Sequence, residues 1–226
     1  MVRFDHVAIG AGDLASGAAA VEAATGLRVP EGGRHRELGT HNLLTATGPD
    51  TFLEVIAVDP EAEAPSRPRW FGLDVPELRA RLAARPGPHA VVLAADDLDA
   101  ALDRARAEGV DHGEALAVSR GTLSWRFAVR GDGAIPLGGA APLLMAWPAG
   151  PHPAGRMADL GLRYADVEIA TPEADRLRAL LAALGLAPGP LRVVAAAEPA
   201  LTVTLSLPGG GRAVLGPGAP AAAGAG

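Results

Sequence analysis

Three side chains in the first 60 residues, His6, His41 and Glu54, could together bind a divalent metal ion. Imidazole and carboxylate groups are ligands of Mn, Fe, Ni, Co and Zn, and two histidines with one carboxylate leave coordination positions open on the metal. A metal ion held in this way would act as a Lewis acid on a carbonyl or hydroxyl group. Glu54 could alternatively leave the metal and abstract a proton next to a carbonyl, which makes it the candidate catalytic residue.

The residues around His6 and Glu54 indicate how both side chains could face one space. Side chains alternate between the two faces of a β-strand, so His6 lies opposite the aliphatic face formed by Val7 and Ile9. Glu54 lies in the apolar segment 52–57, where a carboxylate is costly to bury unless it is paired or binds a metal. The simpler alternative is that Glu54 pairs with an arginine or lies on an edge strand in water.

His41 and Asn42 come from one short polar segment, and two interpretations of that segment remain open. If His41 faces the same space as His6 and Glu54, it is the third metal ligand. The two leucines that follow Asn42 do not fix the phase of the strand, so the sequence does not decide which face His41 occupies. In the alternative, His41 and Asn42 satisfy backbone groups at the start of a strand.

The pattern that contains His6 occurs three times along the chain. Each copy has a short β-type run, a helix start and an Ala/Leu-rich helix that ends at a glycine, and more β-type runs follow each helix. The aligned first runs have His6, Ala90 and Asp166 at the same position, so only the first copy has an imidazole there. This repeat predicts a duplicated supersecondary unit of the βαβββ type and an α+β fold.

The same signals divide the chain into modules. Asp13, Asp97 and Thr171 are expected to be the N-caps of the three helices, with Pro172 as the first residue of the third helix. We predict a first βαβββ module at 1–60, a linker at 61–87, a second βαβββ module at 88–148, a linker at 149–161, a degenerate third module at 162–216 and a frayed tail at 217–226.

Composition excludes several classes of function. The 226 residues contain no cysteine and no lysine, which excludes thiolate chemistry and lysine Schiff bases. A net charge of -6 argues against a nucleic-acid partner. The sequence has no membrane-spanning run and no secretory signal, so we expect no membrane partner and a cytoplasmic location.

One glycine-containing segment, GAGDLA at 10–15, fits the pattern of a dinucleotide-binding loop. Asp13 would then place a carboxylate against the pyrophosphate. The chain after Glu31 also runs from strand to strand instead of continuing β-α-β. We therefore expect no nucleotide cofactor.

Several short motifs follow one another in a fixed order along the chain: FDHVAI at 4–9, GTHN at 39–42, TFLEVI at 51–56, RWFGL at 69–73, SR at 119–120, LSWR at 123–126, PLLMAW at 142–147 and HP at 152–153. Together these motifs resemble the glyoxalase-like domain proteins of the vicinal oxygen chelate superfamily. The resemblance covers residues 3–153 well and the third copy only loosely.

The resemblance implies tandem βαβββ modules whose curved mixed sheets enclose a cavity. In metal-using relatives the ligands come from the first and last strands of each module, and His6 and Glu54 match these positions in the first module. The matching positions in the second module fall near Ala90 and Met145 or Ala146, which cannot bind a metal. Half of a four-ligand site of the glyoxalase I type is therefore missing.

Four residues are candidates for substrate binding: Asn42, Trp70, Arg120 and Trp125. Arg120 and Trp125 recur in the family pattern. As binding residues, Arg120 would hold an anion and the tryptophans would form apolar cavity walls. In the alternative, Arg120 forms a salt bridge with one of the many acidic residues, and Trp70 and Trp125 fill the core.

The leading hypothesis is a metal-dependent lyase, isomerase or dioxygenase that acts on a small carbonyl or hydroxyl compound through Lewis-acid chelation. The alternative is a metal-free protein of the same fold that binds or sequesters a small molecule such as a drug. A third interpretation is an interaction protein whose cavity is filled by its own tryptophans. The curved sheets could pair within one chain or between the chains of a homodimer.

Overall fold

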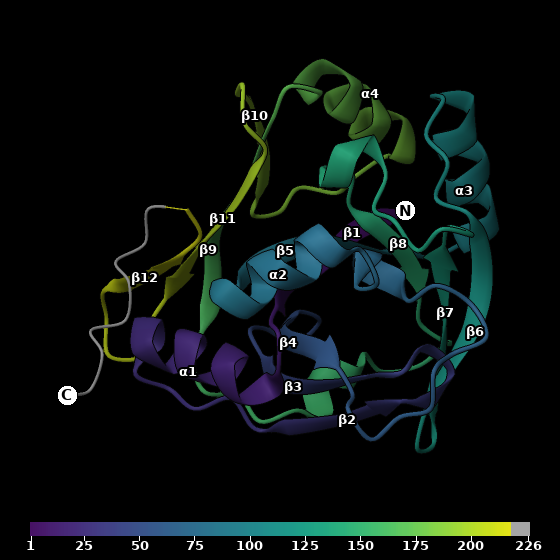
Figure 1. Cartoon of the computed structure of the whole chain (residues 1–226). Coiled ribbons are helices and arrows are strands. Elements are labelled where there is room, and N and C mark those ends of the chain that lie inside the picture. The colour runs from purple at the N-terminus through teal and green to yellow at the C-terminus, as the bar shows by residue number, and fades with distance from the viewer. Residues whose placement is uncertain (218–226) are drawn as a thin grey trace.

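The structure is a computed structural model in which residues 1–217 are described, and the expected frayed tail lies outside the described residues from position 218 on (Figure 1). No helix in the described part is long and apolar enough to cross a membrane. The helices are α1 (Leu14–Thr25), α2 (Pro76–Ala84), α3 (Leu98–Ala107) and α4 (Ala174–Leu184). The strands are β1 (Val2–Gly10), β2 (Glu31–His35), β3 (Thr40–Ala46), β4 (Phe52–Val58), β5 (Gly87–Ala95), β6 (Glu114–Arg120), β7 (Leu123–Val129), β8 (Leu143–Ala146), β9 (Arg163–Thr171), β10 (Leu191–Ala195), β11 (Ala200–Ser206) and β12 (Arg212–Leu215).

Two copies of the βαβββ unit form one curved, mixed sheet of eight strands in the order β2-β3-β4-β1-β5-β8-β7-β6. In each copy the first strand pairs in parallel with the last, β1 with β4 and β5 with β8. The two copies join where β1 and β5 pair antiparallel. The edge strands β2 and β6 approach each other, and Ser119 Oγ donates a hydrogen bond to Glu37 Oε1 at 2.6 Å near this seam. The predicted fold class, an α+β protein with curved mixed sheets around a cavity, is confirmed.

The third copy forms a separate sheet with a different strand order, β10-β9-β11-β12. Its first strand, β9, pairs in parallel with the next strand β10 and antiparallel with β11. In the first two copies the first strand pairs with the last strand of its own copy instead. The third copy therefore keeps the β-α-β start of the repeat and loses the pairing that makes a complete module.

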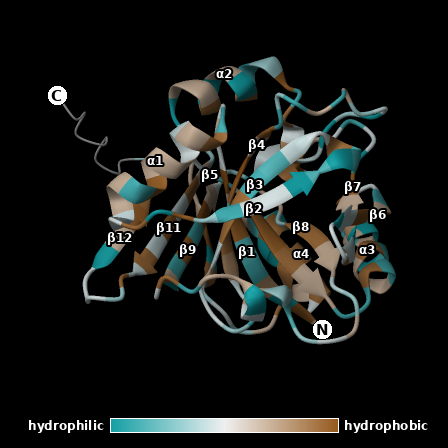
Figure 2. Ribbon diagram, turned by 90° about the horizontal axis from the view of Figure 1, so that it is seen from below, coloured by the Kyte–Doolittle hydropathy of each residue, from teal (hydrophilic) through white to brown (hydrophobic). Residues whose placement is uncertain are grey.

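Two apolar clusters lie on the two faces of the large sheet. Val7 and Ile9 belong to the cluster that packs under α1, α3, α4 and the third sheet. Ala8, on the other face of β1, belongs to the cluster inside the curve of the sheet, which α2 covers with Leu82. Figure 2 shows hydrophobic residues gathered along the central strands, between the helices and the more polar periphery. The alternation along β1 therefore separates an outer core from the inner, cavity-lining face.

Two of the three predicted N-cap residues, Asp13 and Asp97, cap their helices in the structure. Asp13 Oδ1 accepts from the Ser16 amide at 2.8 Å, and Asp97 Oδ1 accepts from the Ala100 amide at 3.0 Å. The expectation that Thr171 caps the third helix was wrong, because α4 begins at Ala174. The Thr171 hydroxyl instead accepts from the Glu173 amide and forms a turn before the helix. The sequence also did not predict β2, or α2 inside the expected 61–87 linker.

We expect the protein to lose stability between pH 7 and pH 5, in part because of His89. Its Nε2–H donates to the Phe71 carbonyl oxygen at 2.7 Å, and burial lowers the pKa of His89 to about 4. Between pH 6.5 and 4 the unfolded chain binds a proton at this residue that the folded chain does not, so stability falls as the pH falls. At pH 5 the loss from His89 is about 2 kcal/mol. Urea unfolding at both pH values should show a smaller loss in His89→Gln, which keeps a donor for Phe71, and an equal loss in both proteins would contradict this.

Candidate functional site

The inner face of the large sheet surrounds a narrow cavity. Both modules contribute to its walls, and the strap after β8 contributes Met157. Aromatic side chains make up much of the lining, namely Phe52, Trp70, Phe71, Trp125, Phe127 and Trp147. The polar lining residues are His6, His35, Asn42, Glu54 and Arg120. A mostly apolar cavity with a few converging polar groups is the usual form of a small-molecule site.

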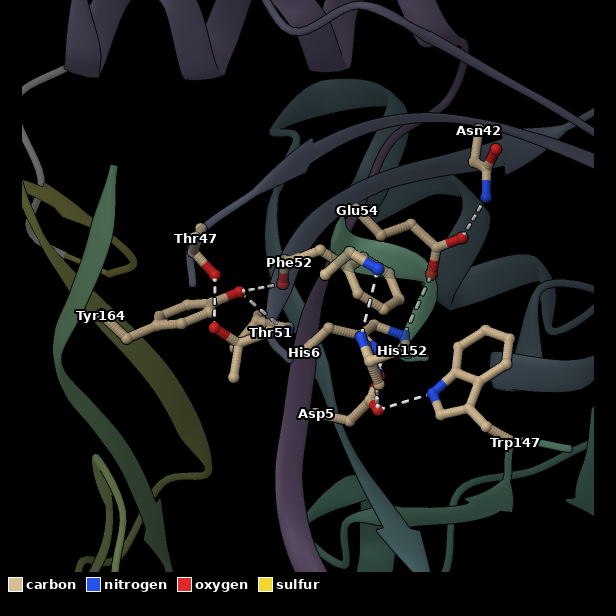
Figure 3. Close-up of polar contacts among 12 residues, drawn as sticks. Asp5, His6, Asn42, Thr47, Thr51, Phe52, Glu54, Trp147, His152 and Tyr164 are labelled. Atoms are coloured by element: carbon tan, nitrogen blue, oxygen red, sulfur yellow. Dashed lines mark hydrogen bonds and ion pairs between the residues drawn. The ribbon is translucent and has the colours of Figure 1, made fainter. Parts of the chain in front are cut away.

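His6 and Glu54 meet at one end of this cavity, as Figure 3 shows. His6 Nε2 lies 3.4 Å from Glu54 Oε2, and both side chains are almost fully buried. The His6 ring stacks on the Phe52 ring, with centroids 4.1 Å apart. Because β1 and β4 are parallel neighbours with Ala8 opposite Glu54, the two ligand-type side chains project from adjacent strands onto the same face.

Asp5 holds the other nitrogen of the His6 ring. His6 Nδ1 donates to Asp5 Oδ1 at 2.6 Å, while Asp5 Oδ2 accepts from Trp147 Nε1 at 2.8 Å and from His152 Nε2 at 3.0 Å. The pairing of β1 with β5 shifts register between Phe4 and His6, and this irregularity lets the consecutive side chains of Asp5 and His6 meet. This role for Asp5 could not be predicted from the sequence, because simple alternation places it on the face opposite His6.

The charges at this end of the cavity are balanced within the site. Burial acts to lower the pKa of His6, but hydrogen bonds to Asp5 and Glu54 raise it to about 9. Burial acts to raise the pKa of Asp5, yet hydrogen bonds from His152 and His6 lower it to about 2. Burial acts to raise the pKa of Glu54, but the hydrogen bond and charge of His6, together with the hydrogen bond from Asn42, lower it. His6 is therefore an imidazolium between two carboxylates when no metal is bound, and a metal ion must displace its proton.

Asn42 connects Glu54 to the basic side of the cavity. Its Nδ2 donates to Glu54 Oε1 at 2.6 Å, and its Oδ1 accepts from the Gly33 amide at 2.9 Å and from Arg120 Nη1 at 3.2 Å. These partners fix the orientation of the amide group, because a flipped amide would face two donors with its NH2. Gly33 also makes room for Arg120, since a Cβ at this position would lie 2.5 Å from Arg120 Cδ.

Arg120 is a half-buried cation that forms no ion pair with a carboxylate within residues 1–217. Burial lowers its pKa, and the charge of Glu54 offsets this only in part. The alternative in which Arg120 forms a structural salt bridge therefore has no support in the described residues. A guanidinium left in this state at a cavity wall favours an anionic group on a ligand.

His35 is a cavity residue that the sequence did not single out. Its Nδ1 lies 3.0 Å from Thr40 Oγ1, which also accepts from Trp70 Nε1 at 3.1 Å. Burial lowers the pKa of His35 to about 4, so the ring is neutral at pH 7. Trp70 and Trp125 both lie edge-on to this ring, with centroids 4.9 and 5.8 Å away. His35 could not be predicted as a cavity residue, because the two glycines before it hide the strand β2 that carries it.

The structure does not bring His41, the third expected metal ligand, to His6 and Glu54. Asn42 points into the cavity, so the alternation along β3 turns His41 to the opposite face, beside a groove lined by α1 and β2. There its Nδ1 lies 3.9 Å from Asp59 Oδ1. Within residues 1–217, no group of three His, Cys, Asp or Glu side chains is arranged to hold a metal ion.

His6 and Glu54 alone nevertheless fit a metal ion held by two protein ligands. Two ligand atoms that each lie about 2.1 Å from one ion are about 3.4 Å apart at a tetrahedral angle, which is the spacing of Nε2 and Oε2. The Asp5–His6 contact supplies the carboxylate that commonly holds the far nitrogen of a metal-binding histidine. In the second module, buried Ala90 and Met145 leave the remaining coordination positions without protein ligands.

The fold is shared with solved structures of low sequence identity. A hypothetical protein from Staphylococcus aureus superposes with a TM-score of 0.62 at 12% identity, covering 88% of each chain. The Mn(II)-bound glyoxalase from Novosphingobium aromaticivorans superposes with a TM-score of 0.51 at 10% identity, covering 96% of this chain and 83% of that one. No curated protein matches the chain with a significant score.

Residues 4–185 match the family described as the glyoxalase-like domain, which takes in both complete modules and the start of the third copy. The order of the strands in the large sheet and the cavity on its inner face agree with this match. The chain belongs to the glyoxalase-like domain family.

Proposed function

We propose that the cavity is the active site of a metal-dependent enzyme that acts on a small carbonyl or hydroxyl compound carrying an anionic group. The observation that carries this proposal is the 3.4 Å spacing of His6 Nε2 and Glu54 Oε2, with Asp5 on the other nitrogen of His6. Mn, Fe, Ni, Co and Zn all accept imidazole and carboxylate ligands.

His6 and Glu54 would hold the metal ion, which when bound would supply Lewis-acid polarisation of a substrate oxygen. With a metal ion bound, Asp5 would keep a proton on His6 Nδ1 and so leave the Nε2 lone pair for the metal ion. Asn42 binds the other oxygen of Glu54 and fixes the plane of the carboxylate. Alternatively, Glu54, which is buried beside the cavity, would leave the metal and take a proton from a carbon next to a carbonyl.

The rest of the cavity would bind and orient the substrate. Arg120 supports recognition of a carboxylate or another anionic group, since it has no carboxylate partner within residues 1–217. Trp70 and Trp125 would enclose the apolar part of the substrate and exclude water from the reacting atoms. This arrangement suits the lyase, isomerase and dioxygenase chemistry of the superfamily.

Equilibrium dialysis of the untagged protein against Mn²⁺ tests the proposal. We expect about one retained Mn²⁺ per chain in the wild type and none in His6→Ala. His41→Ala should retain the ion, because His41 lies on the opposite face of β3. No retained metal in the wild type, tested with Mn²⁺, Fe²⁺, Ni²⁺, Co²⁺ and Zn²⁺ in turn, would contradict the proposal.

A metal-free small-molecule binding protein is the second candidate function. It is favoured by the aromatic lining and by the fact that no three-ligand cluster occurs within residues 1–217. This function predicts that flat aromatic compounds raise the melting temperature in the presence of EDTA, since a ligand that binds only the folded state stabilises it. The enzyme function predicts that ligand-induced stabilisation depends on added metal.

Gly33→Ala is expected to weaken binding of a small carboxylate such as pyruvate by about tenfold or more, because the added Cβ displaces Arg120 and a charged hydrogen bond is lost. Quenching of the fluorescence of the cavity tryptophans measures this affinity. In the control Gly131→Ala, the added Cβ meets open space, and the affinity should not change. Equal affinities in the two variants would show that Arg120 is not the anion-binding group.

A further inference from the structure

The single tyrosine of the chain, Tyr164, reaches from the third sheet to the strands that carry His6 and Glu54. Its hydroxyl donates to the Phe52 carbonyl oxygen at 2.7 Å and accepts from the Val7 amide at 3.0 Å. Figure 3 shows Tyr164 on one side of Phe52, and His6 and Glu54 on the other. The phenol oxygen thus bridges a backbone donor on β1 and a backbone acceptor on β4.

The bridge lies at the end of the β1–β4 ladder that is close to His6. The paired residues of this parallel ladder start at His6 and Phe52 and continue with Val7 and Leu53. Neighbouring parallel strands ordinarily exchange backbone hydrogen bonds directly. At this position the hydroxyl of Tyr164, a side chain from another sheet, links the Val7 amide of β1 to the Phe52 carbonyl oxygen of β4.

That offset sets the geometry of the candidate site. Val7 follows His6 directly, and Phe52 carries the ring on which the His6 ring stacks. Glu54 lies two residues after Phe52 on the same face of β4. A change in the relative position of the two strands at this level would therefore change the 3.4 Å spacing of His6 and Glu54.

We propose that Tyr164 is a positioning residue for the His6–Glu54 pair, so that the third sheet is part of the active-site architecture. The functional meaning of the proposal rests on the metal-dependent function above, whereas the positioning itself does not require a metal. Edge-to-face packing of Tyr164 on Phe4, with centroids 4.9 Å apart, holds the ring in place. Burial raises the pKa of the Tyr164 phenol, so the hydroxyl keeps the proton that it donates to Phe52.

Tyr164→Phe tests the proposal by removing one oxygen atom. NMR of the ¹⁵N-labelled His6 ring should show a clear shift of the Nδ1–H signal in this variant. The Kd for Mn²⁺ should rise about tenfold or more, because His6 and Glu54 would no longer be held at the spacing that fits the ion. The matched control is Val203→Ala, which removes a buried side chain from β11 of the same sheet. This control should lower the melting temperature but leave the His6 signal and the Kd unchanged.

The outcomes separate this proposal from the proposed function. If the wild type binds no metal, the metal-dependent function fails. The NMR signal of His6 alone then tests whether Tyr164 positions the His6–Glu54 pair. An unchanged His6 signal in Tyr164→Phe, or equal changes in Tyr164→Phe and Val203→Ala, would overturn the positioning role. If Tyr164→Phe does not fold, labelling with 3-fluorotyrosine gives one ¹⁹F signal in the native protein. That signal should move when Zn²⁺ binds, because coupling between two sites is reciprocal, and a signal that stays in place would overturn the proposal.

Discussion

Glu54→Gln is expected to lower the affinity of the protein for Mn²⁺ by at least about 100-fold while the fold is kept. Loss of a group that holds a metal ligand in place already costs about 10–100-fold in metal affinity, and this substitution removes the carboxylate of one of the two proposed ligands. Glutamine matches the volume of glutamate, and its amide oxygen can still accept the hydrogen bond from Asn42 Nδ2. The main loss is the negative charge beside His6 Nε2.

Isothermal titration with Mn²⁺ measures this effect directly. The matched control is Glu61→Gln, which removes a carboxylate that is paired with Arg34 on the surface. Glu61→Gln should bind Mn²⁺ with the wild-type affinity. If Glu54→Gln binds Mn²⁺ as tightly as this control, then Glu54 is not a ligand and the carboxylate has another role in the cavity.

Asp5→Asn is expected to destabilise the protein by about 3–5 kcal/mol, the usual result of removing one partner from a buried ion pair. Asp5 is 1% exposed and accepts hydrogen bonds from His6, Trp147 and His152. An asparagine amide has one oxygen for these three donors, and its own NH2 group would face at least one of them. We also expect the affinity for Mn²⁺ to fall by about 10–100-fold, because the His6 ring loses the group that orients it.

Urea unfolding and Mn²⁺ titration of Asp5→Asn provide the measurements. Asp99→Asn is the control of the same chemistry on the surface, where Asp99 pairs with Arg126 at 2.8 Å. Loss of an exposed ion pair changes stability by about 0–1 kcal/mol. Similar stabilities of the two variants would show that the Asp5 contacts do not support the fold, and an unchanged Mn²⁺ affinity would remove Asp5 from the site.

The parts of the site that the sequence predicted are those that depend on short-range periodicity. Alternation along β1 and β4 placed His6 and Glu54 on the inner face. An aliphatic face must pack against the core, and this fixes the direction in which the alternate side chains point. The repeat of this pattern predicted the paired modules. The same principle failed for His41, since two consecutive leucines in β3 fit either phase and the pairing with β4 decides between them.

The residues that the sequence missed depend on contacts between distant segments. Asp5 meets His6 because of an irregularity in the pairing with β5, and alternation along β1 alone predicts the opposite face. His35 enters the cavity from β2, a strand that contains two glycines and has little strand propensity. Tyr164 is separated from its partner Val7 by 157 residues, so no local pattern could predict the contact.

Anomalous diffraction from crystals grown or soaked with Mn²⁺ tests the central claim most directly. The proposed function predicts one anomalous peak in the cavity, within about 2.0–2.3 Å of both His6 Nε2 and a Glu54 oxygen. A peak beside His41 and Asp59, or no peak in the cavity at saturating Mn²⁺, would contradict the claim that His6 and Glu54 hold the metal ion.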